Sequence, residues 1–322
     1  MDSRQRVLKT LNHQIPDRVP VYEVLIDAPI VERLFGYKNT WSWSLSVDDM
    51  IRLHKLLELD SICVPLQSWR APEMKDNKPN LKEVKEPSPS GIDASLERCE
   101  SVVSRAHEEG LCVSAYLHGC FDVTYESLGF ENFMYLLYDD LDYVDAVVEI
   151  FYQYHKKMAE LAVSSGADYV LIGDDIAFKT GIFINPDMFH KLWYKRTMEM
   201  CQVVKRSGKP LEFHTDGRIE GVLHSLIEMG VDMVNPVEPY SNDIIALKKQ
   251  YGGQIGFRGN MDMGGNLAFG TEEETYLEAK ELILALKPGG NYVCSTCHSL
   301  SQNVKLENYQ AMVRAVKEFG WY

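Results

Sequence analysis

DYVLIG (168–173) is one of eight short apolar runs that recur along this 322-residue chain. Each run is almost continuously apolar instead of alternating, as expected for parallel strands that are covered on both faces. The eight runs are VPVYEVL (19–25), DSICVPL (60–66), CVSAYLH (112–118), DYVLIG (168–173), PLEFH (210–214), VDMVNPV (231–237), QIGFRG (254–259) and NYVCS (291–295). Eight strands with intervening helices predict an α/β fold, a (β/α)8 TIM barrel that forms a single domain over residues 1–322.

Amphipathic stretches between the runs predict the helices. They include SVDDMIRLHKLLEL (46–59), DDLDYVDAVVEIFYQYHKKMAELAVSSG (139–166) and GTEEETYLEAKELILALKPGG (270–290), and the last two end at glycines that commonly cap helices. The most loop-like segment is KDNKPNLKEVKEPSPSG (75–91), which follows the second run. In a barrel, that position carries lids and insertions.

Composition excludes several classes of function. The formal charge of −14 argues against a nucleic-acid or anionic-membrane surface, because phosphate binding needs clustered Lys and Arg. The N-terminal residues lack the apolar core of a signal peptide, and no window of eighteen apolar residues predicts a membrane span. We therefore expect a cytoplasmic protein whose seven cysteines stay reduced.

One motif matches the attachment site of a covalently bound cofactor. Cys294, Cys297 and His298 spell C-x-x-C-H, the attachment site of c-type haem. That attachment takes place outside the cytoplasm, so a chain without an export signal is expected to use these groups differently.

In a barrel, the chemistry belongs at the carboxyl ends of the strands, and polar residues are numerous there. Each has an ordinary structural interpretation, such as capping by Asp174, Asp216 or Asp262, so only their convergence on one rim argues for function. They are Glu23, Asp27, His118, Cys120, Asp174, Asp175, His214, Asp216, Glu238, Arg258, Asn260, Asp262, Cys294, Cys297 and His298.

His214, Asp216 and Cys297 are the sharpest candidates for a metal site. Imidazole, carboxylate and thiolate all bind zinc, and a catalytic zinc needs three protein ligands and one open position. His214 and Asp216 can face one ion only if the backbone turns between them, which Gly217 makes plausible. A second ligand set is open: His118 and Cys120 form a His-x-Cys pair of their own, and Glu23, Asp175 or Glu238 could complete a site with them. His298 is an alternative outer donor, and Cys294 an ordinary core residue.

Four long stretches resemble the uroporphyrinogen decarboxylase superfamily and together cover almost the whole chain. They are SRQRVLKTLNHQIPDRVPV (3–21), GDDIAFKTGIFINPDMF (173–189), FHTDGRIEGVLHSLIEMGVDMVNPVEP (213–239) and GGNYVCSTCHSLSQNVKLENYQAMVRAVKEFG (289–320). The resemblance implies a (β/α)8 barrel with a deep pocket. It leaves open a tetrapyrrole decarboxylase and a corrinoid-linked methyltransferase.

The decarboxylase branch fits less well. Its members carry arginines after the first strand and an Asp at the end of the second. Here the first strand carries Glu23 and Asp27, which would repel an octacarboxylate, and the second run ends VPLQSWR without Asp.

The methyltransferase branch fits better, because several members bind zinc through a His-x-Cys pair and a later Cys. His214 matches the His, Asp216 the first Cys and Cys297 the last Cys. The carboxylate in place of a thiolate makes the metal a harder Lewis acid, suited to a methyl ether. The expectation is therefore a zinc methyltransferase that moves methyl from a methoxylated substrate, expected to be aromatic, to the corrinoid of a separate protein. A methyl-corrinoid:thiol methyltransferase and a carboxy-lyase on a smaller acid are the alternatives.

Further residues receive roles from this interpretation. We expect Glu23, His118 and Asp175 to be catalytic, and we expect Trp69 and Tyr240, with Arg70, to meet the corrinoid and its carrier at the mouth of the barrel. The aromatic residues that suit an arene are Trp69, Phe121, Tyr125 and Phe178, each of which has core packing as its ordinary role.

Overall fold

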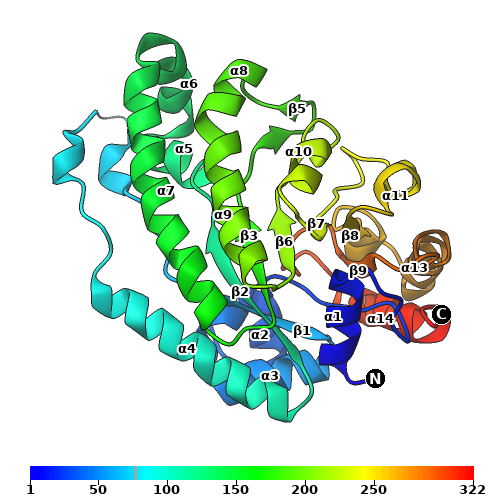
Figure 1. Ribbon diagram of the computed structural model, residues 1–322. Helices are drawn as coiled ribbons and strands as arrows, with labels where there is room; N and C mark the ends of the chain where they lie inside the picture. Colours follow the sequence, from blue (N-terminus) through cyan, green and yellow to red (C-terminus); the bar gives the residue numbers. More distant parts are fainter. Residues whose placement is uncertain (76–77) are drawn as a thin grey trace.

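A computed structural model describes residues 1–75 and 78–322 of the chain. Its centre is a curled, seven-stranded parallel sheet in the order β1-β2-β3-β6-β7-β8-β9 (Figure 1). The strands are β1 Ser61–Pro65, β2 Cys112–His118, β3 Tyr169–Gly173, β6 Leu211–His214, β7 Met233–Asn235, β8 Gly256–Met261 and β9 Tyr292–Thr296. Each of them lies within one of the predicted apolar runs or overlaps it, which confirms the α/β class. A separate antiparallel hairpin is formed by β4 Ala177–Phe178 and β5 Gly181–Ile182.

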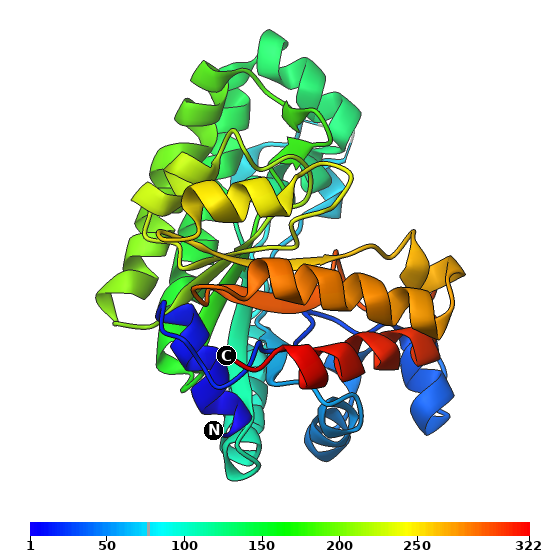
Figure 2. The same ribbon diagram turned by 90° about the vertical axis from the view of Figure 1, so that its right-hand side faces the viewer.

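The strands are mostly apolar because both of their faces are covered. All five residues of β3 are buried, as are all five of β9. Helices surround the sheet on its outer side, and Figure 2 shows α13 and α14 stacked along one flank. Most of the buried apolar side chains form one cluster between the helices and the sheet, and a smaller, separate cluster includes Tyr22, Tyr169 and Met233.

The helices alternate with the strands along the chain. They are α1 Ser3–Leu11, α2 Ala28–Phe35, α3 Val47–Leu56, α4 Pro89–Glu108, α5 Asp122–Leu128, α6 Phe130–Asp139, α7 Leu141–Ser164, α8 Pro186–Phe189, α9 Lys195–Arg206, α10 Leu223–Glu228, α11 Ile244–Tyr251, α12 Asn266–Phe269, α13 Glu272–Leu286 and α14 Leu306–Phe319. The shorter helical turns are η1 Ser42–Ser44, η2 Pro72–Met74, η3 Leu81–Glu83 and the π-helical η4 His190–Tyr194.

The three predicted helical stretches are confirmed as α3, α7 and α13. Helix α7 buries the apolar stripe of its sequence and is followed by Gly166 at φ +82°, a conformation that favours glycine. Helix α13 begins at a capping box in which Thr271 and Glu274 exchange side-chain and backbone hydrogen bonds. None of the helices in the described ranges is long and apolar enough to cross a bilayer.

The first of the eight expected strands, at 19–25, is the point where the prediction of a closed barrel is wrong. Within the described residues, this segment forms only isolated parallel bridges, Val21 with Cys294 and Ile26 with Leu300. It still occupies the eighth position, because the Pro20 carbonyl accepts from Cys294 N (3.0 Å) on β9 and the Val21 carbonyl accepts from Asp60 N (2.7 Å) before β1.

Two local features prevent a regular ladder in this segment. Pro20 has no N–H to donate. The Thr296 N–H on β9 bonds to the Glu23 side chain (3.0 Å) and therefore does not bond to a backbone carbonyl of the segment. The result is a seven-stranded, barrel-like sheet whose gap is filled by an irregular segment.

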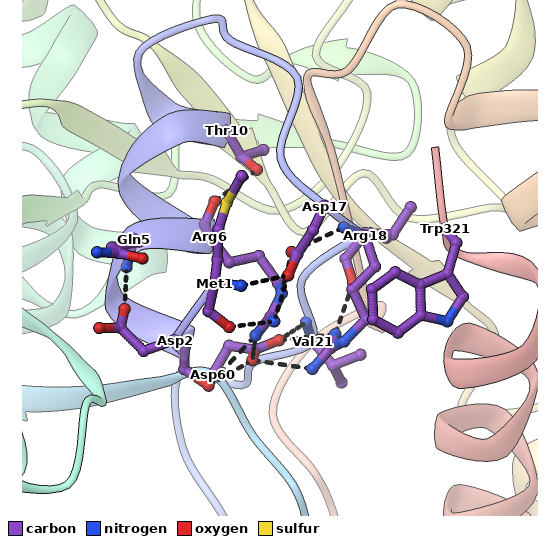
Figure 3. A network of polar contacts seen from close by, with 12 residues as sticks. Met1, Asp2, Gln5, Arg6, Thr10, Asp17, Arg18, Val21, Asp60 and Trp321 are labelled. Atoms are coloured by element: carbon purple, nitrogen blue, oxygen red, sulfur yellow. Dashed lines mark hydrogen bonds and ion pairs between the residues drawn. The ribbon is translucent and has the colours of Figure 1, made fainter.

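Asp60 anchors this segment at the amino end of β1 (Figure 3). Its carboxylate accepts from Ser3 Oγ (2.7 Å), Arg6 Nη1 (2.8 Å), Arg18 Nη2 (3.0 Å) and Val21 N (2.8 Å). Asp60 is fully buried, and both arginines are mostly buried, so the charges are paired away from water. The cluster ties α1 and the 19–26 segment to the sheet.

The predicted loop 75–91 is confirmed only in part. Residues 78–88 contain one short turn, η3, and α4 begins at Pro89, inside the expected loop. Residues 76–77 of that prediction lie outside the described residues.

Candidate active site and metal centre

A cavity of about 360 Å³ lies at the carboxyl ends of the strands, where barrel enzymes place their active sites. Strand ends contribute His118 from β2, Gly173 from β3 and His214 from β6. Leu25 and Trp43 come from the N-terminal region and give one side of the wall an apolar surface. The indole of Trp43 stacks on the Tyr116 ring with centroids 5.5 Å apart. The cavity therefore combines an aromatic wall with a polar one.

His214, Asp216 and His298 meet at the polar wall. One ligand atom of each lies within 4.8 Å of the others. His214 Nε2 is 3.8 Å from Asp216 Oδ1, and His298 Nε2 is 3.7 Å from Asp216 Oδ2. These separations are too long for hydrogen bonds, but they are close to the spacing of about 3.4 Å between ligand atoms around one tetrahedral zinc.

Asp216 shows that this cluster fits a cation. Its Oδ1 atom is buried and has no hydrogen-bond partner, an arrangement that costs free energy unless something else meets the oxygen. Burial raises the pKa of Asp216, while the neighbouring His214 lowers it. Burial alone would lower the pKa of His214, but the carboxylates of Asp216 and Asp175 outweigh it and raise the value. Two imidazoles and a carboxylate are a donor set that suits zinc.

The predicted turn after His214 is present. Gly217 adopts φ +85°, and a Cβ at this position would lie 2.4 Å from the Ala177 carbonyl oxygen, so only glycine fits. The Gly217 N–H donates to Glu238 Oε2 (2.7 Å), and the Asp216 N–H donates to Asp175 Oδ1 (3.0 Å). The backbone thus turns Asp216 back toward His214.

Cys297, predicted as the third ligand, is not part of this cluster among the described residues. Its thiol is buried beside the Tyr240 hydroxyl, with Oη 3.3 Å from Sγ, and burial raises its pKa. His298, expected as an outer donor, is the residue that lies close to His214 and Asp216 instead. The sequence did carry this signal, since His298 adjoins Cys297 and imidazole is a common zinc ligand. Cys294 is fully buried in β9, as its core interpretation expected.

His118 connects two charged neighbours on the same wall. Its Nε2 accepts from Arg70 Nη2 (3.1 Å), and its Nδ1 donates to Asp122 Oδ2 (2.8 Å). Burial and the Arg70 charge lower the pKa of His118 to about 3, so the ring is neutral. Arg70 also pairs with Glu126. His118 thereby orients Arg70, and its expected catalytic role stays a prediction.

The two aspartates after β3 differ in their contacts. Asp174 is fully buried and accepts from the backbone N–H groups of Phe121 (3.2 Å) and Asp122 (2.7 Å) at the start of α5, so it caps that helix. Asp175 lines the cavity with Oδ1 3.8 Å from His214 Nε2. Of the pair, Asp175 is therefore the one that is placed to act on a bound molecule.

Glu23, predicted to be catalytic, points into the wall and is not one of the residues that line the cavity. It accepts from Thr296 N (3.0 Å), Thr296 Oγ1 (2.8 Å) and Tyr309 Oη (3.1 Å). Burial raises its pKa to about 7, although these donors act in the opposite direction. Its contacts hold the 19–26 segment against β9.

The structure corrects the expectation that Trp69 meets a partner. Trp69 is 3% exposed, and its indole packs edge-on against Phe151 and Tyr154 of α7, with centroids 5.0 and 5.4 Å away. The prediction assumed that Trp69 lies in a surface loop, but helix α7 covers its ring. Tyr240, the other residue of that prediction, is 51% exposed and donates to Asp262 Oδ1 (3.0 Å).

Sequence reasoning missed several residues of the cavity wall. Trp43 lies in η1, Asp122 and Glu126 lie on α5, and none of them stands at the end of a predicted strand. They reach the cavity because the connections after the strands fold over the rim. A search restricted to strand ends could not include them.

Comparison with known proteins places the fold and this cavity in a family. The model of the uroporphyrinogen decarboxylase (URO-D) family matches residues 69–319. The chain belongs to the URO-D family. The URO-D match includes strands β2 to β9 and the cluster formed by His214, Asp216 and His298, and it begins after β1.

Solved structures agree with this fold. A methyltransferase from Methanosarcina mazei has a TM-score of 0.78 at 19% identity, with 99% of each chain covered. An L-ribulose 3-epimerase has a TM-score of 0.51 at 11% identity, covering 86% of this chain and 91% of that one. An endo-β-mannanase/endo-β-glucanase from Prevotella bryantii has a TM-score of 0.51 at 14% identity, covering 93% and 47%. At such identities the likeness shows the fold alone. No curated protein sequence matches the chain significantly.

Proposed function

We propose that this URO-D family member is a zinc-dependent methyltransferase that moves a methyl group from a methoxylated, aromatic substrate to the cobalt of a corrinoid on a separate protein. The observation that carries the proposal is the meeting of His214, Asp216 and His298 around a buried carboxylate oxygen that has no hydrogen-bond partner. The methyltransferase from Methanosarcina mazei, similar in fold over its whole length, supports the choice of reaction.

The residues that would hold zinc are His214 through Nε2, Asp216 through Oδ1 and His298 through Nε2. Zinc bound by nitrogen and oxygen donors would act as a Lewis acid on the ether oxygen of the substrate. Asp175 lies beside this position and accepts the Asp216 N–H, so it fixes the carboxylate ligand from the backbone side. Cys297, with its thiol beside Tyr240, is left outside the ligand set.

The aromatic part of the cavity wall supports an aromatic donor. The stacked rings of Trp43 and Tyr116 give it a flat apolar surface, to which Val24 and Leu25 add aliphatic contact. Aromatic rings prefer such stacked or edge contacts with one another. A cavity of about 360 Å³ is within the usual range for a small-molecule site.

Charge argues against uroporphyrinogen as the substrate. Among the described residues that line the cavity, Arg70 is the one arginine or lysine, and Glu126 already pairs with it. Asp122, Asp174 and Asp175 line the same cavity. A substrate with eight carboxylates would therefore find no cluster of basic side chains to bind it among these described residues.

The test is methyl transfer in a defined mixture. Zinc-loaded protein is incubated with a methoxybenzene derivative and a reduced corrinoid protein, and methyl-cobalt formation is followed by absorbance. Transfer is expected with wild-type protein and with Cys297→Ala, and it is expected to be lost in His214→Ala and His298→Ala. Absence of methyl-cobalt across a range of methoxyarenes and corrinoid proteins, or turnover of uroporphyrinogen to coproporphyrinogen, would overturn the proposal.

A further inference from the structure

Asn235 lies between a buried ion pair and the proposed metal-ligand cluster, which consists of His214, Asp216 and His298. Its Oδ1 lies 2.7 Å from His214 Nδ1, and its Nδ2 donates to Glu212 Oε1 (2.8 Å). Glu212 Oε1 also accepts from Arg258 Nε at 2.6 Å. Asn235, Glu212 and Arg258 are all 0% exposed, so none of these contacts competes with water.

Strand register brings these side chains together. Glu212 and His214 are two residues apart on β6, so both point to the same face of the sheet. His214 is the register partner of Asn235 on β7, and Arg258 extends from the neighbouring β8. The three adjacent strands thus hold a continuous chain of four side chains from the barrel interior to the cavity.

Chemistry fixes the orientation of the Asn235 amide. A carboxylate paired with arginine only accepts hydrogen bonds, so the amide must turn its NH2 group toward Glu212. The same NH2 group also donates to the Phe213 carbonyl (3.3 Å). A flipped amide would place its oxygen against both of these acceptors. Oδ1 therefore faces His214.

An amide oxygen can only accept, so His214 Nδ1 must carry the hydrogen. In the neutral imidazole, Nε2 is then left with its lone pair directed toward the cavity, where Asp216 Oδ1 lies 3.8 Å away. This is the tautomer that a metal ligand needs.

We propose that Asn235, held by the Glu212–Arg258 ion pair, is a positioning residue that fixes His214 in the Nδ1–H tautomer with Nε2 free for a cation. The inference rests on the proposed function only for the identity of that cation. The orientation of the ring and its proton follow from the protein's own contacts and can be measured without any metal.

The experiment uses the metal-free protein labelled with 15N-histidine. At alkaline pH, where the imidazole is neutral, the protonated and the bare ring nitrogen have well-separated 15N shifts, and His214→Gln identifies the signals of His214. Wild type is expected to show Nδ1–H. Asn235→Asp keeps the acceptor oxygen, at the cost of repulsion with Glu212, and is expected to keep this tautomer. Asn235→Leu is expected to shift the ring toward Nε2–H.

Zinc titration of the same proteins gives the second measurement. Asn235→Leu is expected to weaken zinc binding roughly 10- to 100-fold, the usual effect of removing a group that orients a ligand. Asn260→Leu is the matched control, because it removes a buried amide on β8 that donates to the Val237 carbonyl and does not contact His214. That variant is expected to bind zinc like wild type.

The outcomes separate the two proposals. An Nε2–H tautomer in wild type, or an unchanged tautomer and zinc affinity in Asn235→Leu, would overturn the role of Asn235. If wild type binds no zinc but Asn235→Leu still changes the tautomer, the positioning role stands and the metal proposal fails.

Discussion

Glu23 is a carboxyl group enclosed by donors in the wall between the 19–26 segment and β9. Burial of Glu23 makes the free energy of unfolding depend on pH. In the native state the carboxyl group keeps its proton up to about pH 7, whereas in the unfolded chain it loses the proton near pH 4.5. The stabilising contribution of the protonated form is complete below about pH 4.5 and is lost as pH rises through 7. Stability should therefore fall across this window.

Glu23→Gln tests this dependence. The amide cannot ionise, and its NH2 group can donate to Thr296 Oγ1, whose own hydrogen can bond to the His298 carbonyl (2.9 Å). Relative to wild type, the variant should gain roughly 2 to 3 kcal/mol between pH 5 and pH 8. Urea unfolding at the two pH values measures the difference. Equal changes in both proteins would show that Glu23 is ionised throughout.

Only some of the residues at the candidate site could be predicted from the sequence. His214 and Asp216 were identifiable, because they stand at a strand end and a glycine follows them. The choice between Cys297 and His298 depends on which way a loop turns its side chains after β9. The prediction that Trp69 lies on the surface was wrong for a related reason, because aromatic residues occur both in cores and at interfaces.

At the scale of elements, the corner between β6 and the β4–β5 hairpin positions the site. Gly217 touches the Ala177 carbonyl there, in a conformation that only glycine adopts without strain. The seven predicted strands formed because buried parallel strands are apolar on both faces. The run at 19–25 shares that composition, and the side-chain bond of Glu23 and the missing N–H of Pro20 distinguish it. Hydrophobicity alone does not reveal such local hydrogen-bonding differences between runs.

Gly217→Ala should distort this corner. The added Cβ would collide with backbone, so Asp216 must move, and both stability and zinc affinity should fall. Gly36→Ala is the matched control, since Gly36 has φ +78° and a Cβ added there would meet nothing within 4 Å, so this variant should lose only about 1 kcal/mol. Thermal unfolding and zinc titration of both variants measure the effects. Normal zinc affinity in Gly217→Ala would show that the corner does not position Asp216.

At the scale of the whole molecule, the two ends of the chain close the sheet together. The Val19 N–H donates to the Gly320 carbonyl (3.0 Å), and Arg18 bridges to Trp321. The Asp60 cluster of Figure 3 then fixes the same segment to β1. These contacts join residues far apart in sequence, and composition alone could not predict them.

Asp60→Ala should destabilise the protein by roughly 3 to 5 kcal/mol, because it leaves the mostly buried Arg18 without its carboxylate and removes one of the two carboxylates that pair with Arg6, which keeps Asp17. Hydrogen exchange in residues 19–26 should increase as well. Glu220→Ala, which removes a surface ion pair with Arg218, should change stability by no more than about 0.5 kcal/mol. Similar losses in the two variants would contradict the anchoring role of Asp60.

X-ray absorption at the zinc edge examines the proposed metal centre itself, because it reports which elements surround the zinc and at what distance. His214, Asp216 and His298 predict about one zinc per chain, surrounded by nitrogen and oxygen at roughly 2.0–2.2 Å. His298→Ala should lose zinc, whereas Cys297→Ala should keep both the metal and the spectrum. A sulfur neighbour at about 2.3 Å would place Cys297 in the ligand set, and a protein without stoichiometric zinc would contradict the centre altogether.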